Sequence, residues 1–161
     1  MLDLDRAARL SRLYLTFGEA VWHAQMIEST ATTYIVVRLR DSGGVGKEQG
    51  RALQDEAKQR TLGSLLGEVR EKEPLEAALT DRLIKLVKDR NWLIHHFARE
   101  ERGLLDRPRA LEAMMKRLCA VTDECKALNK ILASRVEEYV VSRGVTREFI
   151  DREATRLLDA W

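Results

Sequence analysis

The feature that most constrains this chain is the helical spacing of its apolar residues over long stretches without proline. The 161 residues include only two prolines, Pro74 and Pro108. Apolar side chains recur at three- and four-residue steps in residues 5–40, 75–97 and 111–142. That spacing places the apolar side chains on one face of an α-helix. These three segments therefore predict long amphipathic helices.

The shorter segments fit the same architecture. Glycines in residues 43–46 end the first helix, and residues 47–59 are polar but compatible with a helix. An apolar pattern restarts at residues 61–68, with Thr61 or Ser64 as the helix N-cap, and Thr146 begins a last amphipathic helix. We expect one domain spanning residues 1–161, an all-α up-down bundle with long N-terminal and C-terminal helices.

Composition narrows the classes of function. The net charge of +2 is nearly neutral, so the chain as a whole has no strong field that would attract nucleic acid. Cys119 and Cys125 form no CxxC pair and indicate reduced thiols. No signal peptide and no apolar run long enough to span a bilayer are recognisable. We expect a cytoplasmic protein with no membrane association.

One arginine interrupts the apolar face of the segment 75–97. Arg90 falls near the middle of the stripe, although burying an unpartnered guanidinium costs several kcal/mol or more. Asn91 and His95, four residues apart, share one flank of this stripe, whereas His96 points to the opposite flank. The pattern predicts a polar site within a packing face. Glu28, on the first helix, is a candidate to face it, although a solvated carboxylate is the simpler expectation.

The run Arg90-Asn91-Trp92-Leu93-Ile94-His95 resembles the signature of the HEPN superfamily, an arginine followed by a polar residue and, a few positions later, a histidine. Many HEPN proteins are metal-independent ribonucleases of toxin–antitoxin, antiphage and RNA-processing systems, and they usually act as dimers. Other HEPN-like domains are non-catalytic dimerisation or protein-interaction modules. The resemblance implies a HEPN-like helical bundle, an RNA substrate and a homodimer with the segment 75–97 near its two-fold axis.

The resemblance assigns roles to three residues. His95 would be the general acid/base, Arg90 the phosphate clamp, and Asn91 would orient the histidine or hold a phosphate oxygen. His96 also fits the permitted spacing, but Asn91 lies between Arg90 and His95 on the helix and favours His95. Such a site needs neither a metal nor a cofactor, and it leaves DNA intact because DNA lacks the attacking 2′-hydroxyl.

The charged segment 98–109 follows the motif and contains four arginines. Arg99 and Arg102, together with His96, are our candidates for RNA binding, with a solvated surface loop as the alternative. The family's nucleotide-modified toxins carry a tyrosine two places after the histidine, where this chain has Phe97. If the protein is a toxin, we therefore expect an antitoxin that acts by binding and occlusion.

Overall fold

The computed structural model describes residues 4–39, 47–72, 76–100 and 103–159, and it contains only helices within these ranges. They are α1 (Leu4–Leu39), α2 (Lys47–Gln59), α3 (Leu62–Lys72), α4 (Ala77–His95), α5 (Phe97–Glu100), the short 3-10 helix η1 (Leu104–Asp106), α6 (Pro108–Ser142) and α7 (Arg147–Leu158). The predicted all-α bundle is confirmed. The glycine-rich segment 43–46, Pro74 and Arg102 lie outside the described residues.

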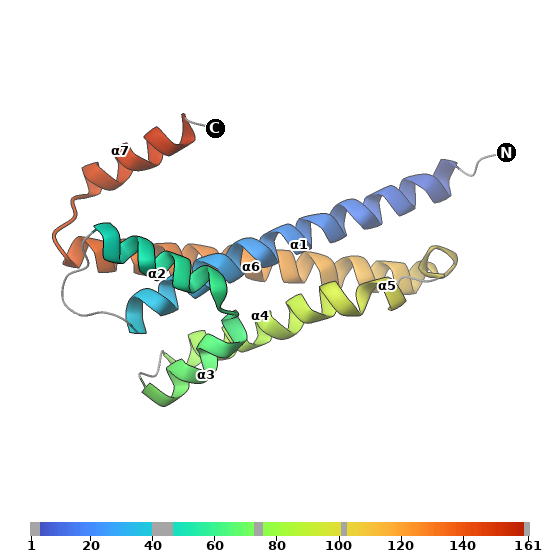
Figure 1. Ribbon diagram of the computed structural model, residues 1–161. Coiled ribbons are helices and arrows are strands. Elements are labelled where there is room, and N and C mark those ends of the chain that lie inside the picture. Colours follow the sequence, from blue (N-terminus) through green and yellow to red (C-terminus); the bar gives the residue numbers. More distant parts are fainter. Residues whose placement is uncertain (1–3, 40–46, 73–75, 101–102, 160–161) are drawn as a thin grey trace.

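The two longest helices, α1 and α6, run side by side and form the spine of the bundle (Figure 1). α4 packs against both, and α2 and α3 pack against α1. The pairing follows from the sequence, because α1 and α6 each carry an apolar stripe long enough to cover the other. No described helix combines the length and apolarity that crossing a bilayer requires.

The core is formed mainly by the stripes that the periodicity identifies. Buried side chains come from every long helix, including Leu13, Ala20, Ala24, Ile27, Ala31 and Tyr34 of α1, Leu79, Leu83, Leu86 and Leu93 of α4, and Met114, Leu118, Val121, Cys125, Leu128 and Leu132 of α6. Each large apolar side chain removed from water contributes about 1.5–3 kcal/mol before the entropy cost of folding. This continuous core fixes the position of α4 and therefore of Arg90.

The end of α4 differs from the simple stripe. The spacing of residues 75–97 predicts Ile94 on the inner face and Trp92 on the same flank as His96, but Ile94 is half exposed and Trp92 is buried. α4 ends at His95, and Phe97 then turns into the core, where its ring stacks on Phe17 at 4.0 Å between centroids. Trp92 meets Phe97 edge-on at 6.3 Å. Aromatic packing at the helix end therefore replaces Ile94 with Trp92 on the buried side.

The last helix, α7, extends away from the rest of the bundle in Figure 1. Gly144, at φ +88°, makes the turn before it, and Thr146 Oγ1 accepts a hydrogen bond from the backbone N–H of Phe149 at 3.2 Å. Thr146 is thus the cap that the sequence predicts. The spacing of this last segment predicts Phe149 and Leu158 on its apolar face, but both side chains are exposed. The expectation of a single domain over residues 1–161 stays a prediction.

Candidate functional site

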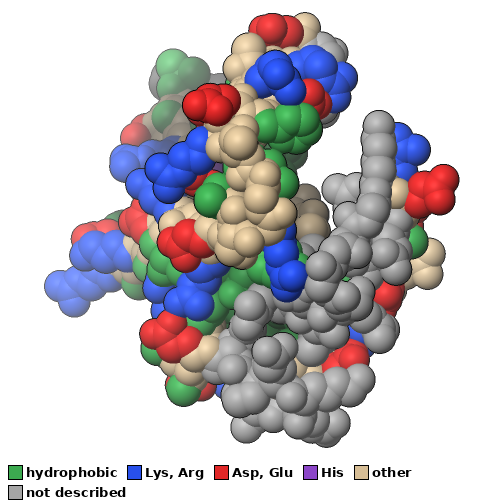
Figure 2. All heavy atoms as spheres, turned by 90° about the vertical axis from the view of Figure 1, so that its left-hand side faces the viewer, with side chains coloured by type: hydrophobic (Ala, Val, Ile, Leu, Met, Phe, Trp, Pro, Cys, Tyr) green, Lys and Arg blue, Asp and Glu red, His purple; other side chains and the backbone are tan. Residues whose placement is uncertain are grey.

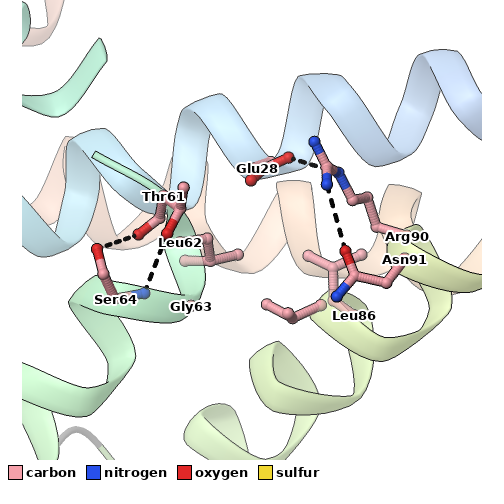
Figure 3. A pocket seen from close by; sticks show the side chains of 9 residues that line it. Glu28, Thr61, Leu62, Gly63, Ser64, Leu86, Arg90 and Asn91 are labelled. Carbon is pink, nitrogen blue, oxygen red and sulfur yellow. Dashed lines mark hydrogen bonds and ion pairs between the residues drawn. The ribbon is translucent and has the colours of Figure 1, made fainter. Parts of the chain in front are cut away.

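Arg90 is held between two helices. Its Nε lies 3.2 Å from Glu28 Oε2 of α1, and its Nη1 donates a hydrogen bond of 3.2 Å to Asn91 Oδ1 (Figure 3). Glu28 is therefore the acidic partner of Arg90, and the simpler expectation of a solvated carboxylate is wrong. The ion pair also explains how an arginine can occupy the apolar stripe of α4, because a nearby carboxylate offsets the cost of partial burial.

The guanidinium of Arg90 is only partly used by these contacts. Nε is buried, but its N–H makes no hydrogen bond of acceptable geometry, so the contact with Glu28 is an ion pair without a directed hydrogen bond. Among the described residues, Nη2 has no partner. A guanidinium carries five N–H donors, so several of them stay available to a ligand.

Arg90 and Asn91 form one wall of a cavity of about 330 Å³. The opposite wall is the start of α3, where Ser64 N donates to Thr61 Oγ1 at 3.2 Å and Ser64 Oγ donates to Thr61 O at 2.9 Å. Figure 3 shows this turn facing Arg90 across the cavity. The full lining is Glu28, Thr61, Leu62, Gly63, Ser64, Leu86, Val87, Arg90 and Asn91. The cavity has the size of a small ligand site and combines apolar walls with a few polar groups.

The two histidines of the motif lie beyond the cavity. His95 is the last residue of α4 and His96 is its C-cap, and both side chains are exposed. Neither is among the residues that line the cavity. Asn91 and His95 do share a flank, one turn apart, which corresponds to about 6 Å along the helix axis. The structure thus joins Arg90 to Asn91 and leaves His95 at the helix end next to them.

Arg99 lies on a second, separate cavity of about 520 Å³, which Arg107 and Arg117 also line. The guanidinium of Arg117 stacks 3.4 Å over the ring of Trp92, whose Nε1 donates to Glu100 Oε1 at 2.8 Å. Sequence reasoning did not assign Arg117, because it comes from α6 and meets the motif only through the fold. Helical spacing within one segment does not predict the stacking on Trp92.

One end of the molecule is electrostatically mixed. On the end of the molecule that Figure 2 shows, Lys and Arg side chains are interspersed with Asp and Glu. Among the described residues, no group of three or more His, Cys, Asp or Glu side chains is arranged to hold a metal ion. Burial raises the pKa of the Cys125 thiol to about 11, so this cysteine stays protonated at neutral pH.

Comparison with protein-family models, with curated proteins and with solved structures gives no match for this chain. Function is therefore inferred from the residues around Arg90 and from the resemblance of the motif.

Proposed function

We propose that this protein is a metal-independent endoribonuclease of the HEPN type. The observation that carries the proposal is the placement of Arg90 and Asn91 on the wall of a polar cavity, with His95 one turn further along the same flank of α4. An arginine, an amide and an imidazole within two turns of one helix supply a phosphate clamp and a proton-transfer group. A homodimer, RNA as the substrate, and an antitoxin that binds without modifying the motif belong to the same proposal.

The reaction uses the substrate's own nucleophile. The 2′-oxygen forms a bond to the adjacent phosphorus as the bond to the 5′-oxygen breaks, which yields a 2′,3′-cyclic phosphate and a 5′-hydroxyl end. The 2′-hydroxyl loses its proton and the leaving 5′-oxygen gains one, and His95 serves one of these two transfers. Arg90 holds the non-bridging phosphate oxygens, on which charge accumulates in the transition state.

Glu28 has a positioning role in this scheme. Its contact with Nε fixes the Arg90 side chain from the α1 side, while Nη1 donates to Asn91 Oδ1 beside the cavity. A guanidinium that is already oriented loses less entropy when it binds a phosphate. The contact with Glu28 also lowers the positive field at the site, so we expect weak binding of isolated phosphate and tighter binding of a longer RNA.

The arginines of the second cavity supply further contacts for such an RNA. Arg99 follows the motif directly, and Arg107 and Arg117 line the same cavity. Arg117 is held in place by Trp92 and by an ion pair of 3.7 Å between its Nη1 and Glu100 Oε2, and its remaining N–H groups are offered to phosphate oxygens. We propose that the RNA backbone passes from Arg90 past His95 toward this group.

The decisive experiment is incubation of the purified protein with mixed RNA and with DNA in excess EDTA. We expect RNA cleavage that leaves 2′,3′-cyclic phosphate ends, with DNA intact and with cleavage abolished in Arg90→Ala. Cleavage that stops in EDTA, or that Arg90→Ala retains in full, would contradict the proposal.

A second candidate is a non-catalytic helical interaction module. It is favoured by large apolar side chains on the solvent side of α1, above all Trp22, which is 62% exposed. Isolated exposed apolar residues are ordinary, but several aligned on one helix point to a contact surface. A wild-type protein that cuts no RNA and still self-associates would support this candidate.

A further inference from the structure

α1 carries a second apolar stripe on the side opposite to its core. Leu4, Leu15, Trp22 and Met26 are 80, 73, 62 and 48% exposed, in that order. At about 100° per residue these four side chains fall within a sector of roughly 40°, together with Ala8. The buried residues of α1, such as Leu13, Ala24 and Ile27, lie on the far side of the helix axis.

The spacing of this outer stripe is symmetric about Leu15. Leu4 and Met26 are equally far from Leu15 in the two directions along α1, and so are Ala8 and Trp22. In an antiparallel pair of α1 helices with Leu15 at the two-fold axis, Leu15 therefore faces Leu15 and Leu4 faces Met26. Ala8 faces Trp22, so a small side chain meets a large one, as interdigitated helix packing requires.

Charges beside the stripe match in the same register. Arg12 and Glu19 lie on one flank of the stripe, which in a two-fold antiparallel pair meets the same flank of the other chain. Arg12 of one chain then lies within about 1.5 Å, measured along the axis, of Glu19 of the other. Glu19 is half exposed, and its Oε1 lies 2.8 Å from Lys126 Nζ and 3.9 Å from His23 Nε2, which leaves Oε2 for a cation of the other chain. Gly18 has no side chain to hold the two helices apart. A Cβ at this position would meet no atom within 4 Å, so this side of α1 is open.

We infer that this protein forms a two-fold homodimer through the outer face of α1, with antiparallel α1 helices centred on Leu15. A second copy is the occupant because only a partner with the same spacing and charge order matches the stripe at every position. The paired segment, residues 4–26, spans about 33 Å. A single helix pair is a small interface, so the dimer should dissociate at micromolar concentrations.

This dimer is an alternative to the homodimer that the resemblance implies, in which α4 lies near the two-fold axis. Glu28, which holds Arg90, lies about 135° around α1 from the centre of the outer stripe. The two Arg90 cavities would open away from the two-fold axis, one per chain. The inference is independent of ribonuclease activity, since it concerns only the surface of α1.

Sedimentation of the full chain over a range of concentrations tests the interface. Leu15→Glu places two carboxylates at the axis, and because Leu15 is exposed the fold should stay intact by circular dichroism. We expect a wild-type dimer and a dissociation constant raised at least tenfold in Leu15→Glu. Ile94→Glu, at an exposed apolar residue of α4, is the matched control and should leave the dimer intact. A monomeric wild type, or a dimer lost in Ile94→Glu but kept in Leu15→Glu, would overturn the inference.

Cysteine cross-linking tests the register. In a Cys119→Ser background, which removes the exposed native thiol, Leu15→Cys should form a disulfide-linked dimer under mild oxidation. Leu4→Cys alone should not, because its two copies would lie about 33 Å apart. Mixing Leu4→Cys chains with Met26→Cys chains should yield the cross-linked heterodimer. A cross-link in Leu4→Cys alone, or none in the mixture, would overturn the antiparallel register.

Discussion

Two arginines of α4 have nearly the same exposure but make different contacts. The side chains of Arg82 and Arg90 are 35% and 37% exposed, and each contacts a glutamate of another helix. Arg82 makes a bidentate pair with Glu124 of α6, with Nε and Nη2 donating at 2.8 and 3.1 Å. Arg90 makes only a single ion pair with Glu28, and its Nη1 is turned to Asn91 at the cavity.

The difference shows that partial burial and an acidic partner do not by themselves identify a functional arginine. Both donors on the edge of Arg82 that faces Glu124 are occupied, so this side chain joins α4 to α6. Arg90 lines a cavity and keeps donors that have no partner among the described residues, so a ligand could use them without breaking the contact with Glu28. Hydrogen-bond geometry, rather than exposure, separates the structural arginine from the candidate catalytic one.

The largest expected effect is the difference in RNA cleavage between lysine substitutions of these two arginines. Arg90→Lys should lower RNA cleavage by about 10²–10³-fold, because a point charge cannot replace the planar fork on the phosphate. Arg82→Lys changes the same chemistry two turns away and should leave cleavage within a few-fold of wild type. Initial rates in EDTA on one RNA substrate measure both. Equal losses in the two variants would mean that Arg90 acts only through the fold.

A second comparison separates the two adjacent histidines. His95→Ala should reduce cleavage by about a hundredfold or more, the usual contribution of a general acid/base. His96→Ala should lose far less, since His96 points to the other flank of the helix. Both side chains are exposed, so neither substitution should shift the melting temperature, and thermal unfolding provides the control. A larger loss in His96→Ala would transfer the catalytic role to that residue.

Much of the fold was predictable because helical spacing reports which face is buried. The stripes of α1, α4 and α6 follow directly from it, and so does Arg90 as the exception within a stripe. The position of Phe97 in the core also explains why a tyrosine at that place would be ill-suited to modification here: its side chain is 2% exposed and stacks on Phe17. The spacing of apolar residues within a segment therefore predicts the features that depend on that one helix.

The surroundings of Arg90 depend on several helices and were less predictable. Glu28 comes from α1 and Thr61 from the start of α3, and spacing within α4 carries no information about either. The same holds for Arg117, which reaches Trp92 from α6. The outer stripe of α1 was present in the sequence, but it is recognisable as unburied only once the inner stripe has its partners.

The smallest expected effect is the contribution of the two ion pairs to the free energy of unfolding. A hydrogen bond from Arg82 holds the pKa of Glu124 below its usual range, against the opposing effect of burial. The pKa of Arg82 is raised in turn, mainly by the same hydrogen bond. We expect Glu124→Gln to lower the free energy of unfolding by on the order of 1 kcal/mol at neutral pH, and Glu28→Gln by a few tenths.

The pH dependence sharpens this prediction. Because the folded-state pKa of Glu124 is depressed, the pair's contribution is present above the pKa of the carboxyl in the unfolded chain and is lost as the pH falls through the lower, folded-state pKa. The difference between wild type and Glu124→Gln should therefore shrink on acidification, as measured by urea unfolding at a series of pH values. Arg82→Ala provides the control, because it removes the same hydrogen bonds. When Glu124→Gln is added to Arg82→Ala, the change in the free energy of unfolding should no longer show this dependence on pH. If Glu28→Gln instead shows the larger loss at neutral pH, the contact between Glu28 and Arg90 is a structural link comparable to that of Arg82, and the contrast between the two arginines fails.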